Sequence, residues 1–280
     1  MTTKDYESYY VPAQSHWPIV GAVALFLVAV GAGEYVSTLK SGDAGWGGWV
    51  LLAGLAMVIY MVFGWFSNVI DESMAGKYSA QMDTSFKQGM SWFIFSEVMF
   101  FAAFFGALFY ARIFSVPWLG GDSNNAMTFE VLWPTFEATW PLVKTPDGTE
   151  TTAMPWTGLP LINTLILLTS SVTAHFAHVA LEQNKRTALK GWLGFTVLLG
   201  VVFLILQVEE YMHAYQAMNL TLQSGIYGNT FFMLTGFHGM HVTLGTIMLL
   251  VMFFRVLKGH FTPDNHFAFQ AASWYWHFVD

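Results

Sequence analysis

The sequence contains no cysteine, which excludes a disulfide framework, Cys-ligated zinc or iron–sulfur centres and a cysteine nucleophile. Charged residues make up only 10% of the chain, against about 25% in an ordinary soluble domain. The formal net charge of −7 leaves no basic surface of the kind that binds a nucleic-acid backbone. A phosphate-binding loop, a dinucleotide fingerprint and a nucleophile elbow are missing as well. These absences exclude a soluble globular protein and a nucleic-acid partner.

The sequence contains several long hydrophobic segments. Hydrophobic residues form 55% of the chain, and a bilayer core needs about 20 of them per helix. Stretches of this length occur at residues 18–37, 47–70, 89–114, 159–180, 191–212 and 226–254, and a further stretch begins near Phe267. We therefore predict an all-α membrane protein, a seven-transmembrane-helix bundle that forms a single polytopic domain over residues 1–280. Glycines inside the stretches, among them Gly31, Gly54 and Gly106, are expected to allow close helix contact.

The distribution of basic residues predicts the orientation in the membrane. With the N-terminus inside, the inner tail (residues 1–17) and the inner loops hold eight Lys and Arg residues, and the outer loops hold three. Because basic residues accumulate on the inner side, we expect a cytoplasmic N-terminus and an outer position for the long loop at residues 115–158. The polar start resembles neither a signal peptide nor a transit peptide.

Glu97 is the most informative polar residue, because carboxylates at membrane depth are costly. It lies about 15 Å along its helix from Lys87 and about 22 Å from Arg112, near the middle of the bilayer. Glu97 is either a proton-active or interface-organising group or a buried glutamic acid that holds helices together.

Histidines also occur within the hydrophobic stretches. His238 and His241 are three residues apart and share a helix face, but no further ligand is evident at their depth. We interpret them, together with His178, as structural side chains that hydrogen-bond across helices. The sequence thus predicts no catalytic residue, no metal site and no heme or copper in this chain.

Other polar and aromatic residues lie near the expected membrane surfaces. Carboxylates and lysines flank the loop after the second stretch, namely Asp71, Glu72, Lys77 and Lys87. They would bind lipid headgroups or form a solvated interface. Trp65 fits an interfacial aromatic belt. Glu209, Glu210 and His213 lie at the end of the fifth stretch, and we expect them to be interfacial rather than buried.

Four motifs then point to a known family. They are SEVMFF at residues 96–101, LPLINTLILL at 159–168, TGFHGMHVTLGT at 235–246 and ASWYWHFVD at 272–280, supported by FGW at 63–65 and by Glu210–Tyr211. In this order they resemble subunit III of the heme–copper cytochrome c oxidases. The resemblance runs from about residue 60 to the end, whereas the first 45 residues and the loop at 115–158 are not diagnostic.

The resemblance implies a non-catalytic core subunit of a proton-pumping respiratory oxidase, in which subunit I reduces oxygen to water. Helices 1–2 would stand apart from helices 3–7 across a cleft filled with phospholipids. Subunit I would contact this chain directly and carry the hemes and the copper of the oxygen-reducing site, and subunit II would belong to the same complex. Because a transit peptide is missing, we expect a bacterial inner (plasma) membrane in preference to the mitochondrial inner membrane. Stability, proton uptake and oxygen access are the contributions implied for this subunit. Contacts with cytochrome c or with other respiratory complexes in a supercomplex fit the same family.

The resemblance also carries over to single residues. Glu97 matches the family's buried, carbodiimide-reactive glutamate, and Glu72 matches a carboxylate at the lipid cleft. Lys87 and Trp65 are further lipid-binding candidates. Departures from the family pattern are Gln270 in place of a glutamate, Ala177–His178 in place of a histidine pair, and Tyr78 in place of a histidine.

Two alternatives remain open at this point. One is subunit III of a quinol oxidase, which the helix count disfavours because that branch usually has five helices in this subunit. The other is a stand-alone proton-coupled transporter with Glu97 as its relay. The segment from Phe267 to Asp280 measures only about 20 Å as a helix, short of the roughly 30 Å membrane core. We therefore expect the seventh helix to be truncated at Asp280, and the natural chain to extend by roughly ten to twenty residues to complete the span.

Overall fold

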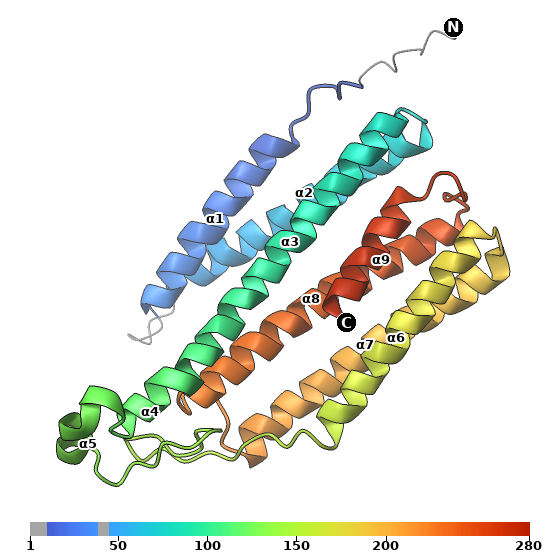
Figure 1. The fold of residues 1–280 in the computed structure, drawn as a ribbon. Coiled ribbons are helices and arrows are strands. Elements are labelled where there is room, and N and C mark those ends of the chain that lie inside the picture. The colour runs from blue at the N-terminus through green and yellow to red at the C-terminus, as the bar shows by residue number, and fades with distance from the viewer. Residues whose placement is uncertain (1–9, 39–44) are drawn as a thin grey trace, which may run out of the picture. The chain divides into compact units, whose positions relative to one another are not determined.

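The computed structural model describes residues 10–38 and 45–280 (Figure 1). In this part of the chain, the helices of thirteen residues or more are α1 (Trp17–Thr38), α2 (Gly47–Met74), α3 (Ala80–Tyr110), α6 (Leu159–Glu182), α7 (Arg186–Ala217), α8 (Ile226–Leu257) and α9 (Phe267–Val279). Six helical segments of the described chain are long and apolar enough to cross a membrane. The prediction of an all-α membrane bundle is confirmed. Most of the predicted inner tail, residues 1–9, and Lys40 lie outside the described residues.

The largest boundary difference is at the start of α3, which begins at Ala80 rather than at residue 89. The Ser79 hydroxyl accepts a hydrogen bond from the backbone N–H of Met82 at 3.3 Å. Thr84 and Ser85 donate their hydroxyls to carbonyls one turn earlier, at 3.1 Å each. Hydropathy misses such turns because they are polar, although local hydrogen bonds hold them in the helix.

The chain divides into two compact units, Met1–Phe86 and Lys87–Asp280. In the first unit α1 packs against α2 through glycines. A Cβ atom at Gly31 would lie 2.3 Å from the backbone nitrogen of Leu51, and one at Gly54 would lie 2.7 Å from that of Val28. These two glycines allow the close contact that the sequence predicts. At Gly106 in α3, no atom of the described residues outside α3 lies within 4 Å of such a Cβ.

In the second unit α6, α7, α8 and α9 lie side by side (Figure 1). Trp276 of α9 is completely buried among them, and its Nε1–H donates to the Ser170 hydroxyl of α6 at 3.1 Å. Cβ atoms at Gly200 of α7 and Gly245 of α8 would each come within 2.9 Å of its ring. The indole thus fills a space that three neighbouring helices leave open.

The long segment between α3 and α6 contains short helical pieces. They are a π-helical turn (Ala111–Ser115), α4 (Val116–Leu119), a 3₁₀ turn (Ser123–Asn125) and α5 (Ala126–Leu132). Val116, Phe136 and Leu142 form a small buried cluster with Tyr227 of α8 against it. Farther along, the Lys144 ammonium pairs with the Glu150 carboxylate at 2.8 Å and holds the pKa of Glu150 below its usual value. This segment is therefore folded onto the second unit by its own contacts.

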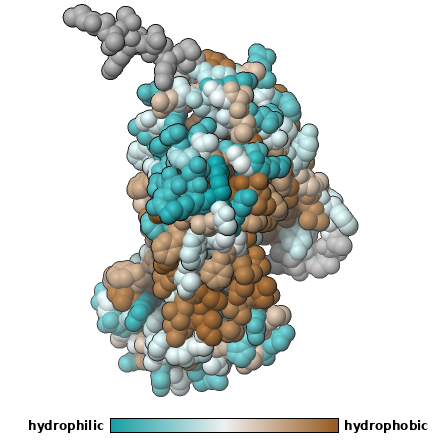
Figure 2. All heavy atoms as spheres, turned by 90° about the vertical axis from the view of Figure 1, so that its right-hand side faces the viewer, coloured by the Kyte–Doolittle hydropathy of each residue, from teal (hydrophilic) through white to brown (hydrophobic). Residues whose placement is uncertain are grey.

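Hydrophobic side chains face outward on α6 and α7, as expected of helices in contact with lipid. Exposed members include Leu165, Leu168, Val172, Leu198 and Ile205. Figure 2 shows a broad hydrophobic area on one face of the molecule, with hydrophilic side chains gathered above it. Polar side chains turn inward instead: the hydroxyls of Thr173 on α6 and Thr196 on α7 are hydrogen-bonded to each other at 2.8 Å and buried.

Candidate functional site

Glu97 and His241 form a hydrogen-bonded pair between α3 and α8. The Glu97 Oε2 and His241 Nε2 atoms are 2.8 Å apart. Only 6% of the His241 side chain and 21% of the Glu97 side chain are exposed. Both residues belong to the second unit, although 144 positions separate them in the sequence. The sequence alone does not predict this contact, because Glu97 and His241 belong to separate hydrophobic stretches.

The hydrogen bond of the other His241 nitrogen, Nδ1, indicates how many protons the Glu97–His241 pair holds. Nδ1 lies 2.6 Å from the Phe237 carbonyl oxygen, which can only accept, so Nδ1 carries a proton. One further proton then lies between Nε2 and Oε2. The pair is either a neutral imidazole with a glutamic acid or an imidazolium with a carboxylate, and its total charge is zero in both forms. A shift of this proton therefore adds no net charge to a low-dielectric region.

Aromatic rings surround the pair. The ring centroids of Phe101, Phe100 and Tyr275 lie 5.0, 5.9 and 6.4 Å from that of His241. Phe93 of α3 stacks on Tyr275 of α9 at 6.1 Å. These rings limit the water around the pair, which strengthens its hydrogen bond and makes removal of either partner costly.

His238 makes a different contact from His241, although both lie on α8. Its Nε2–H donates to the Val279 carbonyl of α9 at 3.0 Å, and its ring meets Phe203 edge-on at 5.7 Å. His238 and His241 therefore do not converge on a common ligand. One links α8 to α9, and the other links α8 to α3.

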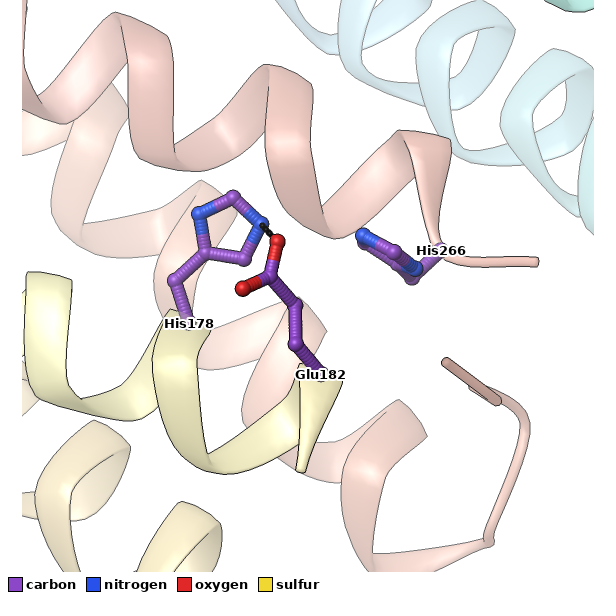
Figure 3. Close-up of side chains that lie close together, drawn as sticks. All are labelled: His178, Glu182 and His266. Atoms are coloured by element: carbon purple, nitrogen blue, oxygen red, sulfur yellow. Dashed lines mark ion pairs between the residues drawn. The ribbon is translucent and has the colours of Figure 1, made fainter. Parts of the chain in front are cut away.

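His178 lies near the end of α6, where it meets a carboxylate and a second histidine. Its Nε2 is 3.7 Å from Glu182 Oε1, and its ring centroid is 5.6 Å from that of His266, the residue before α9 (Figure 3). The sequence alone does not indicate that His178 meets His266, because the two residues come together only in the folded chain.

A comparison with known proteins identifies the family. The family model for cytochrome c oxidase subunit III matches residues 7–280. The chain belongs to the cytochrome c oxidase subunit III family. Cytochrome c oxidase subunit 3 of Eudorcas rufifrons and that of Dugong dugon are each 36% identical to it over 282 residues, covering 99% of this chain and 94% of each relative. The subunit 3 of Papio hamadryas is 36% identical over 279 residues, with the same coverage.

The family places this subunit III chain within a heme–copper oxidase, an oxidoreductase complex. The family motifs SEVMFF and GFHGMHV each contribute one partner of the hydrogen-bonded pair, Glu97 and His241. The resemblance found by sequence alone is confirmed.

The lipid-binding candidates of this subunit III chain are distributed over both units. In the first unit the Tyr78 hydroxyl donates to Glu72 Oε2 at 2.8 Å. Burial, and then this hydrogen bond, raise the pKa of Tyr78, which keeps the phenol a neutral donor. Trp65 lies about two helical turns before Glu72 on α2, is 49% exposed and stacks on Phe66. Lys87 begins the second unit.

Glu210 is a residue whose placement the sequence analysis predicted wrongly. Only 6% of it is exposed, whereas Glu209 and His213 are exposed as expected. Residues three, four or seven positions apart share a helix face, and Glu210 shares the buried face of α7 with Phe203 and Ala214. Its position at the end of a hydrophobic stretch carries no information about which face it occupies.

Proposed function

We propose that this chain is the non-catalytic core subunit III of a proton-pumping respiratory cytochrome c oxidase in a bacterial inner membrane. Subunit I packs directly against it and reduces oxygen to water, and subunit II belongs to the same complex. Those subunits hold the hemes and copper, and this chain holds neither. The family match over residues 7–280 supports the assignment.

The Glu97–His241 pair is the observation that best supports a role in proton uptake. The pair holds one proton between two groups without any change in net charge. Within the described residues, the hydrogen-bond partner of His241 Nδ1 is the Phe237 carbonyl, which cannot pass a proton on. The pair therefore stores a proton and orients α3 against α8, and it is not the route of the pumped protons. The contributions proposed for the subunit as a whole, from its family resemblance, are stability of the complex, sustained proton uptake and access of oxygen to subunit I.

Phospholipids are the further ligands of the proposed subunit. Glu72, Trp65 and Lys87 are the residues assigned to them. Glu72 keeps lone pairs beyond the one that accepts from Tyr78, and Trp65 presents an exposed ring at the same helix face. A cationic lipid headgroup suits a carboxylate in this position.

Purification of the chain from its own membrane tests the assignment. An affinity tag on this subunit should recover a coloured complex with heme absorption bands, a dinuclear copper domain and cytochrome c oxidation. Recovery of hemes without that copper domain, with quinol oxidation instead, would indicate the quinol oxidase. A colourless chain purified alone would contradict the assignment and favour a stand-alone transporter.

A further inference from the structure

The ends of α6 and α9 bring together three side chains that can act as metal ligands. His178 and Glu182 are four residues apart on the last turns of α6, and His266 precedes the first turn of α9. One ligand atom from each residue lies within 4.8 Å of the others. Figure 3 shows the Glu182 carboxylate in the space between the two imidazole rings. The three groups converge from two segments of the second unit.

The nitrogen atoms of this cluster are available to a ligand. His178 Nε2 is buried and has no hydrogen-bond partner within the described residues. His266 Nδ1 lies 3.1 Å from the Thr262 carbonyl oxygen and must donate its proton there, so the lone pair is on Nε2. A histidine that binds a metal commonly donates its other N–H to a backbone carbonyl in this way. The tautomer of His266 is therefore already the one that a metal requires.

We propose that His178, Glu182 and His266 bind one first-row divalent transition metal ion, with Zn²⁺ the best match. Two imidazoles and one carboxylate are a recurrent zinc ligand set, in which water fills the fourth position. Mg²⁺ and Ca²⁺ are disfavoured because they prefer oxygen ligands. Ligand atoms in a tetrahedral zinc site lie about 3.3 Å apart, since each Zn–N or Zn–O bond is about 2.0–2.1 Å. His178 Nε2 and Glu182 Oε1, 3.7 Å apart, are within about 0.4 Å of that spacing. The three ligand atoms lie within 4.8 Å of one another, so side-chain rotations that close them by at most about 1.5 Å would complete the site.

Bound metal would join the end of α6 to the start of α9. These helices already contact each other, but the loop that leads to His266 contains no ion pair that holds it to α6 within the described residues. The site was missed from the sequence because His178 and Glu182 alone are a weak pair. The third ligand comes from a segment that only the fold places beside them.

Zinc binding to the purified oxidase complex tests this proposal without any measurement of turnover. The complex is washed with a chelator, equilibrated with micromolar Zn²⁺ and analysed for zinc by mass spectrometry. The wild-type complex should retain one more equivalent of zinc than complexes that carry His266→Ala or Glu182→Gln. In each of these two variants the affinity of the complex for this additional zinc ion should be at least about tenfold lower than in the wild type. Glu182→Gln changes an exposed side chain, so it remains informative if His266→Ala fails to assemble.

His175→Ala is the matched control, because His175 is exposed on the same helix and does not belong to the cluster. It should bind zinc like the wild type, and a Mg²⁺ titration should show no difference among the variants. X-ray absorption of the additional zinc in the wild type should report two imidazole ligands, and the same spectrum should be found for His175→Ala. Equal zinc content in all four proteins, or no zinc retained by the wild type, would overturn the site and leave the oxidase assignment intact.

Discussion

At the scale of single residues, polar side chains at membrane depth in this protein bridge neighbouring helices. Glu97 bonds His241 between α3 and α8, Thr173 meets Thr196 between α6 and α7, and Tyr211 meets Thr235 at 2.7 Å between α7 and α8. Lipid offers no alternative hydrogen bonds, so each contact fixes two helices in a register. A change at one of these residues should therefore affect assembly before it affects catalysis.

The two partners of the Glu97–His241 pair should respond differently to substitution. Glu97→Gln should keep more than half of the turnover per heme, because a glutamine amide can still donate to His241 Nε2. His241→Ala leaves Glu97 without its partner, at a cost of about 1–3 kcal/mol, and should lower the amount of this subunit retained in the purified complex. Turnover and subunit content of the purified variants measure both effects.

Thr243→Ala is the control for this pair, since Thr243 is exposed on α8 and its hydroxyl donates to the Gly239 carbonyl of the same helix. It should match the wild type in both measurements. Turnover at background level for Glu97→Gln in a fully assembled complex would show that Glu97 is an essential proton carrier and would refute its assignment as a proton store.

At the scale of helices, the contact between α1 and α2 depends on the missing side chain of Gly31. A methyl group there would lie 2.3 Å from a backbone nitrogen of α2, which cannot move aside as a flexible side chain would. Gly31→Ala should therefore destabilise the first unit by about 1–3 kcal/mol. Gly33→Ala is the control on the same helix, because nothing lies within 4 Å of its Cβ position. Thermal unfolding of the complex in detergent should show a lower midpoint only for Gly31→Ala, and equal midpoints would contradict backbone contact at this site.

The attachment of α9 depends on Trp276. Replacement by alanine would leave a cavity among α6, α7 and α8 and remove the hydrogen bond to Ser170, at a cost of about 3–5 kcal/mol. Trp156→Ala, at a side chain that is 76% exposed, should have little effect. Limited proteolysis near the C-terminus should accelerate for Trp276→Ala alone. Similar cleavage rates in the two variants would show that α9 is held by other contacts.

The sequence predicted the helices well and their contacts poorly. Long apolar runs identify membrane helices because lipid excludes unpaired backbone groups, and all seven predicted stretches are helical. Run length does not report which side of a helix faces a neighbour, so the burial of Glu210 and the approach of His241 to Glu97 were missed. The third member of the cluster, His266, was missed for the same reason. Contacts between residues far apart in the chain arise only from helix packing.

At the scale of the whole molecule, the orientation of the chain determines which side of the membrane the proposed metal cluster and the segment with α4 and α5 face. The excess of basic residues in the tail and in the loops after α2, α6 and α8 predicts that these segments face the cytoplasm. The proposed metal cluster lies at the end of α6 and before α9, beside two of these loops. In this orientation it would draw its ion from the cytoplasm, whereas the segment that contains α4 and α5 would face the opposite compartment.

Single cysteines can establish this orientation, because residues 1–280 contain no other cysteine. Met127→Cys in α5 and Gln183→Cys after α6 place a thiol at exposed positions on the two predicted sides. In sealed right-side-out vesicles, a membrane-impermeant maleimide should label the subunit band of Met127→Cys and leave that of Gln183→Cys unlabelled. Detergent should then expose both to equal labelling, which controls for differences in thiol reactivity. Eight basic residues lie on the predicted inner side and three on the outer side, and Lys4 and Lys40 contribute one to each. Without these two residues the basic residues still favour the same orientation. Labelling of Gln183→Cys alone in intact vesicles would reverse the orientation and move the proposed metal cluster to the outer surface.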